Sequence, residues 1–182
     1  MWHSAISHVP ARLSLEYDYS FGNIYNFLKW LAVSFVFFLL WVHNRQAIHA
    51  SFSVVFMGVF IDDAFEIHEK INSVTSEALG IPANHAGVIL LLGLTFISGF
   101  FIFIARRNSN TKSRMQSNVI IMLMSCLIFF GGGLDAIQSE LSGVLAYGFG
   151  IIEDGLELMI ASTVLKTSRK FLEESMKFNK LN

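Results

Sequence analysis

The sequence contains five apolar stretches that approach or exceed the roughly 20 residues a helix needs to cross a bilayer, and this feature constrains the fold most. Only a helix or a closed barrel satisfies its own backbone polar groups in lipid, and stretches of this length favour helices. Of the 182 residues, 53% are hydrophobic and 18 are Phe, more apolar surface than a soluble domain of this size covers with charge. We therefore predict an all-α, polytopic membrane helix bundle with five transmembrane helices, over residues 24–43, 47–70, 86–105, 118–138 and 144–165.

The two ends of the chain differ from this apolar middle. Residues 1–20 carry charge and lack the short apolar core of a cleavable signal peptide, which predicts an N-terminal interfacial segment. Residues 21–168 form the predicted transmembrane helical domain, and residues 169–182 a basic cytoplasmic tail. An alternative with four transmembrane helices, in which the first stretch is only interfacial, stays open.

Basic side chains gather on one side of the predicted membrane. With five spans, the loops 43–46 and 106–116 and the chain from Lys166 onward share that side and hold ten of the thirteen Lys and Arg residues. Cytoplasmic loops are enriched in Lys and Arg, so we expect a multi-pass protein of the cell (inner) membrane with its N-terminus outside and its C-terminus in the cytoplasm.

Acidic residues follow the opposite pattern and enter the predicted spans. Twelve of the fourteen Asp and Glu residues fall outside or in the outer half of the membrane. At about 100° per residue, Asp62, Glu66 and Glu69 would share one face of a continuous second helix. Apart from Lys70 at the end of the second stretch, no Lys or Arg lies within the predicted spans that carry acids. An ionised acid at the bilayer centre costs about 2.5–3.5 kcal/mol, so protons or a bound cation must neutralise the group.

This cluster is the predicted metal site. Carboxylate oxygens suit hard divalent ions, and mixed carboxylate and imidazole ligands suit Mn, Fe or Zn, so the sequence leaves a divalent metal open among Mn, Fe, Zn and Ca. His68 and His85 are further candidate ligands, with an interfacial position as their alternative. The candidate carboxylate ligands are Asp62, Asp63, Glu66, Glu69, Asp135, Glu153, Asp154 and Glu157.

The second and fifth stretches also resemble each other. Residues 59–67 align with residues 150–158 at an offset of 91, and both segments combine acids with aliphatic residues in the same order. The second and fifth helices would run in opposite directions, which predicts an inverted repeat of helices 1–2 and 4–5, an arrangement common in transporters. The pair Asp62-Asp63, followed by His68-Glu69, resembles a segment of uncharacterised bacterial multi-pass membrane proteins, a resemblance that implies no particular activity.

Three functions fit these features. The first is binding and transport of a divalent cation, coupled to protons or not. The second is a membrane-embedded di-iron or di-manganese carboxylate oxidoreductase with a lipid-soluble substrate, although the Glu-x-x-His pairs usual in such sites do not occur. The third is a non-catalytic subunit or pH sensor. Whether the chain is an enzyme is left undecided. The expected partners are the lipid bilayer, the metal ion and, in a homo-oligomer, further copies; no nucleic-acid surface is expected.

Overall fold

The computed structural model describes residues 21–81, 83–138 and 144–180, and within them the chain is helical with no strand. The predicted all-α class is therefore confirmed, whereas the N-terminal segment 1–20 lies outside the described residues. The helices are α2 (Phe21–Asn44), α3 (Ala47–Phe65), α4 (Ile67–Leu79), α5 (Ala83–Arg107), α6 (Thr111–Gln138) and α7 (Val144–Lys180).

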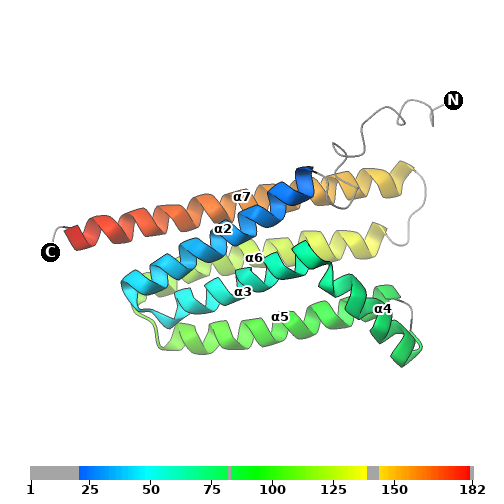
Figure 1. Cartoon of the computed structure of the whole chain (residues 1–182), viewed down its shortest axis with the longest axis horizontal. Coiled ribbons are helices and arrows are strands. Elements are labelled where there is room, and N and C mark those ends of the chain that lie inside the picture. The colour runs from blue at the N-terminus through cyan, green and yellow to red at the C-terminus, as the bar shows by residue number, and fades with distance from the viewer. Residues whose placement is uncertain (1–20, 82, 139–143, 181–182) are drawn as a thin grey trace.

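Five of these helices lie side by side, and α4 lies at one end of the bundle (Figure 1). Around the bundle, α2 packs against α3, α3 against α5, α5 against α6, α6 against α7, and α7 against α2. Helices α2, α5 and α7 run in one direction, and α3 and α6 run in the other (Figure 1). The α2–α3 turn, the α5–α6 turn and the C-terminal end of α7 therefore lie at the end opposite α4 (Figure 1).

Four helical segments are long and apolar enough to cross a membrane: Ile24–Asn44, Ala47–Phe65, His85–Arg107 and Thr111–Phe130. Large apolar side chains on their outer faces are exposed, among them Phe96 at 76% and Val54 at 72%. Such surfaces are typical of helices that face lipid. The fifth predicted span, residues 144–165, contains three acids and lies within α7, which packs between α2 and α6; its transmembrane position stays a prediction.

A cluster of four aromatic side chains joins α2 to α3. Trp30 stacks on Phe56 with ring centroids 5.6 Å apart, and Phe37 contacts Phe52 at 5.1 Å and Phe56 at 5.6 Å. All four side chains are at most 2% exposed. Stacked and tilted ring pairs add to the packing energy of a core, so this aromatic cluster fixes how the two helices lie.

A reciprocal pair of hydrogen bonds supports the same interface. The Ser34 hydroxyl donates to the Ser53 carbonyl at 2.8 Å, and the Ser53 hydroxyl donates to the Ser34 carbonyl at 3.0 Å. Interhelical hydrogen bonds in membranes contribute about 0.6 kcal/mol each. We expect Ser34→Ala to lower the free energy of unfolding by about that amount. Chemical denaturation of the purified protein in detergent would check this, with Ser51→Ala, whose hydroxyl bonds within its own helix, as the control.

Two predicted boundaries differ from the structure. The second stretch, expected as one helix to Lys70, breaks at Glu66, and most of the expected connection over 71–85 is the helix α4. At the other end of the chain, α7 runs through residue 169, where the predicted tail begins, and the tail was itself expected to be helical. Polar residues alone therefore did not mark the helix ends.

Candidate functional site

The break between α3 and α4 is built from local polar contacts. Glu66 adopts the left-handed conformation (φ 50°, ψ 42°), which is uncommon outside glycine. The Asp62 carboxylate accepts a hydrogen bond from the His68 backbone N–H at 2.8 Å, and its second oxygen lies 3.2 Å from His68 Nδ1. Lys70 Nζ donates to the carbonyl of Phe65 at 2.7 Å and so satisfies the end of α3. These contacts hold α4 at an angle to α3.

This break corrects the predicted acidic face. Asp62, Glu66 and Glu69 were expected on one side of a continuous helix, but Glu66 lies in the turn and Glu69 belongs to α4. The Asp62 carboxylate accepts a hydrogen bond from the start of α4, so Asp62 has a structural role in the break between α3 and α4. Lys70, expected as the nearest neutralising charge, caps α3 instead.

We expect Asp62→Ala to loosen α4, because the substitution removes both the acceptor for the His68 N–H and the carboxylate oxygen beside the His68 ring. Loss of such a cap costs about 1 kcal/mol. Hydrogen exchange measured by mass spectrometry should show faster exchange in the first turn of α4. Glu77→Ala removes an exposed carboxylate later in the same helix and should leave that exchange unchanged.

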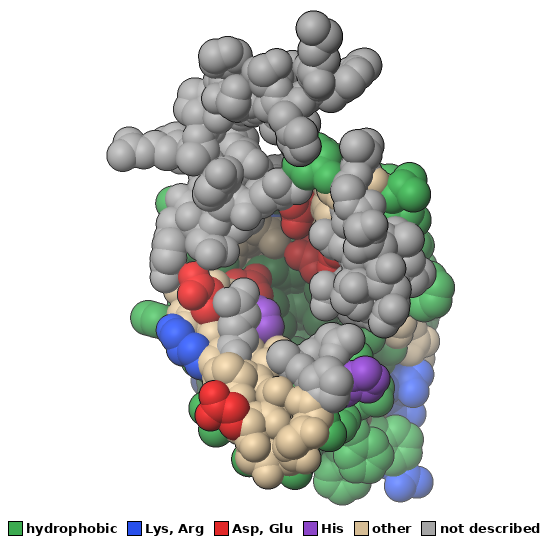
Figure 2. All heavy atoms as spheres, turned by 90° about the vertical axis from the view of Figure 1, so that its right-hand side faces the viewer, with side chains coloured by type: hydrophobic (Ala, Val, Ile, Leu, Met, Phe, Trp, Pro, Cys, Tyr) green, Lys and Arg blue, Asp and Glu red, His purple; other side chains and the backbone are tan. Residues whose placement is uncertain are grey.

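Partly buried acids of α3 and α7 lie at this end of the bundle and influence one another electrostatically. Asp63, in the last turn of α3, interacts electrostatically with Glu157 of α7 as well as with Asp62 and His68. Glu153, Asp154 and Glu157 are all partly buried along α7. Viewed from this end, the molecule is hollowed at its centre, and red acidic side chains and a histidine gather at the hollow (Figure 2). We call this hollow the acidic recess.

The structure adds Lys29, a residue that the sequence reasoning missed. Lys29 lies on α2, is 5% exposed, and donates from Nζ to the Leu158 carbonyl of α7 at 3.2 Å. It also lies 4.2 Å from the centre of the Tyr25 ring. A positive charge therefore reaches the backbone of α7 one residue beyond Glu157. The sequence did contain an indication of this role, because Lys29 is a lone lysine inside an apolar span. An ionisable residue in such a span, basic or acidic, is a candidate functional residue.

The remaining predicted ligands are spread over three helices. His85 is exposed in the first turn of α5, and Asp135 lies in the last turn of α6. The side chains of Asp135 and Glu69 lie outside the described part of the structure. Among the residues whose side chains are described, no three His, Cys, Asp or Glu converge closely enough to hold a metal ion.

The opposite end of the bundle carries a polar cavity. Its volume is about 270 Å³, and its walls come from α2, α6, α7 and the α5–α6 turn. Within it, the Ser175 hydroxyl bonds the Asn44 side chain, and a ring nitrogen of His43 lies 3.4 Å from the Ser175 carbonyl. The buried His49 ring packs against Phe37, between this cavity and the aromatic cluster. The cavity lining is His43, Asn44, Asn110, Lys112, Ser113, Gln116 and Ser175.

Comparison with known proteins places most of the chain in one family. Residues 12–170 match the family described as "Domain of unknown function (DUF8692)". None of the curated proteins and none of the solved structures compared with the chain matches it.

Proposed function

We propose that this chain, which belongs to the DUF8692 family, is a membrane transporter that exchanges a divalent cation for protons at the acidic recess. The feature that supports this most is the electrostatic repulsion between Asp63 of α3 and Glu157 of α7, two partly buried carboxylates. Two carboxylates contributed by separate helices form the central pair of the proposed site.

Proton and cation would compete for this pair for a simple reason. Two carboxylates close together in a partly buried space repel each other when both are ionised, so one holds a proton in the empty site. A divalent cation stabilises both ionised groups and displaces that proton. Binding a cation would therefore release at least one proton, which is the coupling that an exchanger needs.

The bundle also carries the parts of a gated pathway. The acidic recess lies at one end and the polar cavity at the other. Between them, the aromatic cluster of Trp30, Phe37, Phe52 and Phe56 is closely packed and apolar. A cation at the recess would cross only after these side chains move, so the described form corresponds to a site closed on the side of the polar cavity.

The proposed orientation follows the basic residues. Arg45, Arg106, Arg107 and Arg114 lie at the end that holds the polar cavity, and the positive-inside rule assigns this end to the cytoplasm. The acidic recess would then open outward, and α7 would be the fifth span. Helices α3 and α7 run antiparallel, as the predicted inverted repeat requires (Figure 1). The proposed orientation does not depend on this repeat.

The oxidoreductase alternative gains less support. A di-metal carboxylate centre usually takes His from the same helices as its Glu ligands. His68, the histidine nearest to the acids in sequence, is held by Asp62 in the break between α3 and α4. We therefore favour transport over redox chemistry.

Uptake into proteoliposomes tests the proposal. Vesicles with purified protein and a trapped fluorescent indicator should accumulate Mn²⁺ or Ca²⁺ when an outward proton gradient is imposed, and the lumen should lose protons as the cation enters. Tight binding of Mn²⁺ without uptake would contradict transport. Stoichiometric iron with an oxygen-dependent optical change would favour the oxidoreductase, and neither metal binding nor flux would favour a subunit or sensor.

A further inference from the structure

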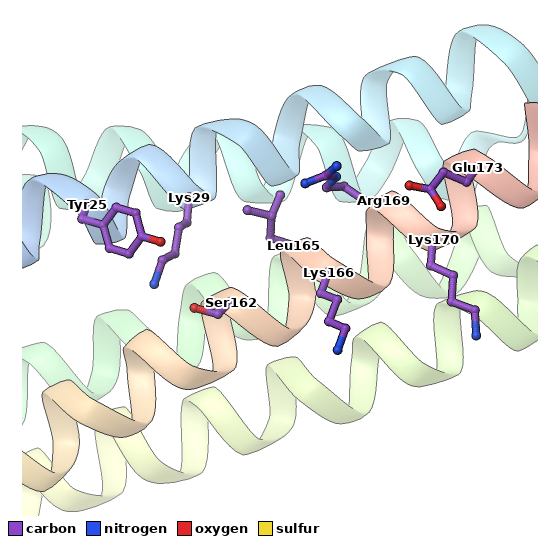
Figure 3. A pocket seen from close by; sticks show the side chains of 8 residues that line it. All are labelled: Tyr25, Lys29, Ser162, Leu165, Lys166, Arg169, Lys170 and Glu173. Carbon is purple, nitrogen blue, oxygen red and sulfur yellow. The ribbon is translucent and has the colours of Figure 1, made fainter.

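A second charged feature lies on the outside of the bundle, in the groove between α2 and α7 (Figure 3). The groove has a volume of about 420 Å³. Its charged lining is strongly basic, with four Lys and Arg side chains against one acid. The residues that carry the argument are Tyr25, Lys29, Lys166, Arg169, Lys170 and Glu173.

Contacts between α2 and α7 show where the groove lies relative to the predicted membrane span. Lys29 reaches Leu158 of α7, and His43 lies beside Ser175. The α7 residues between these two contacts therefore lie alongside the first candidate span, Ile24–Asn44. Lys166, Arg169 and Lys170 all fall in this interval. At 1.5 Å per residue, Lys166 lies about 14 Å along α7 from Ser175.

These three basic side chains are exposed on the bundle surface. Within the described part of the chain, none of them forms a salt bridge or donates a hydrogen bond, and Glu173 lines the same groove without pairing to them. In Figure 3, Lys166 and Lys170 point to the same side of α7. Positive charges beside a membrane span need an anion, and the surrounding medium at this depth is lipid.

We propose that the groove between α2 and α7 binds an anionic phospholipid from the leaflet at the basic end of the bundle. The phosphate lies against Lys166, Arg169 and Lys170, and the acyl chains extend along α2 toward Tyr25. Long basic side chains reach the headgroup region while their apolar stems stay in hydrocarbon. Basic pockets between transmembrane helices on this side of a membrane are known to bind anionic headgroups. The inference does not depend on the proposed transport.

Thermal unfolding of the full chain in detergent tests this assignment. Added phosphatidylglycerol should raise the unfolding temperature and phosphatidylcholine should not, and native mass spectrometry should show retained phosphatidylglycerol. We expect Lys166→Gln/Lys170→Gln to weaken binding of phosphatidylglycerol on the order of 30-fold, because each basic residue near an anionic surface contributes about fivefold in affinity. Arg107→Gln/Lys177→Gln removes two exposed basic charges outside the groove and should keep the wild-type preference.

Several results would overturn the assignment. Equal loss of preference in the groove variant and the matched control would mean that overall charge, and not the groove, selects the lipid. Stabilisation by inorganic phosphate alone, without retained lipid, would replace the lipid by a free anion. A change from oligomer to monomer in the groove variant at constant lipid would assign the groove to a second copy of the chain.

Discussion

Glu157→Gln is expected to reduce proton-driven uptake of Mn²⁺ or Ca²⁺ into proteoliposomes at least about 100-fold. Mutating a residue that only supports a metal ligand already lowers affinity or activity by up to about 100-fold, and Glu157 is proposed to bind the cation itself. The substitution keeps the size and shape of the side chain and removes its charge. A neutral amide neither shares the proton with Asp63 nor neutralises a divalent cation, so both halves of the exchange are lost. Initial uptake rates at a fixed proton gradient measure the effect.

Asp63→Asn should have the same effect, and the double variant should be little worse than either single one. Residues that act as one unit give strongly non-additive losses, because the first substitution already disables the pair. Additive losses would mean that the two acids act at separate places. This comparison tests directly whether Asp63 of α3 and Glu157 of α7 act together.

The matched control is Glu77→Gln. Glu77 is exposed on α4, at the same end of the molecule, and its loss changes the net charge by the same amount. Uptake should stay at the wild-type rate. If Glu77→Gln and Glu157→Gln reduced uptake equally, the negative potential of this whole end would matter, and the proposed pair would not be the site. Unchanged unfolding temperatures would exclude a folding defect in either variant.

Phe37→Ala is expected to give the largest loss of stability, about 3 kcal/mol. This value is the lower end of the range for Phe→Ala in protein cores, because moving an apolar side chain from lipid into a membrane protein gains little from the hydrophobic effect. Phe37 is 1% exposed and contacts Phe52, Phe56 and His49. Its removal leaves a cavity at the centre of the aromatic cluster, and the lost contacts join α2 to α3. Chemical denaturation in detergent measures the free energy of unfolding.

Phe96→Ala is the control for this substitution. Phe96 lies on α5 and is 76% exposed, so it faces the surroundings of the bundle. The same change of side chain should alter the free energy of unfolding by less than about 0.5 kcal/mol, as for surface positions without special features. Equal losses for Phe37→Ala and Phe96→Ala would mean that α5 and α2 are equally buried in an assembly, which would contradict the aromatic cluster as the main packing site.

The agreement between sequence and structure differs along the chain. The apolar stretches at 86–105 and 118–138 both lie within helices, and the first is the more uniformly hydrophobic of the two. The second predicted helix was extended too far, to Lys70, whereas α3 ends at Phe65. The acidic residues after Phe60 are compatible both with a continuous helix and with a break between two helices, so composition does not distinguish the two. The break depends on Asp62 bonding His68, a contact between side chain and backbone that helical periodicity does not reveal.

The sequence by itself determined the helical class, the apolar character of the long helices, and the separation of basic from acidic ends, because these depend on composition and on local periodicity. Only the tertiary structure decided which groups influence one another. Asp63 lies near enough to Glu157 for electrostatic repulsion, Lys29 donates to the carbonyl of Leu158, and Lys166 lines the groove beside α2. The physical reason is that the order of helices around the bundle is set by packing between distant segments, and electrostatic partners follow from that order.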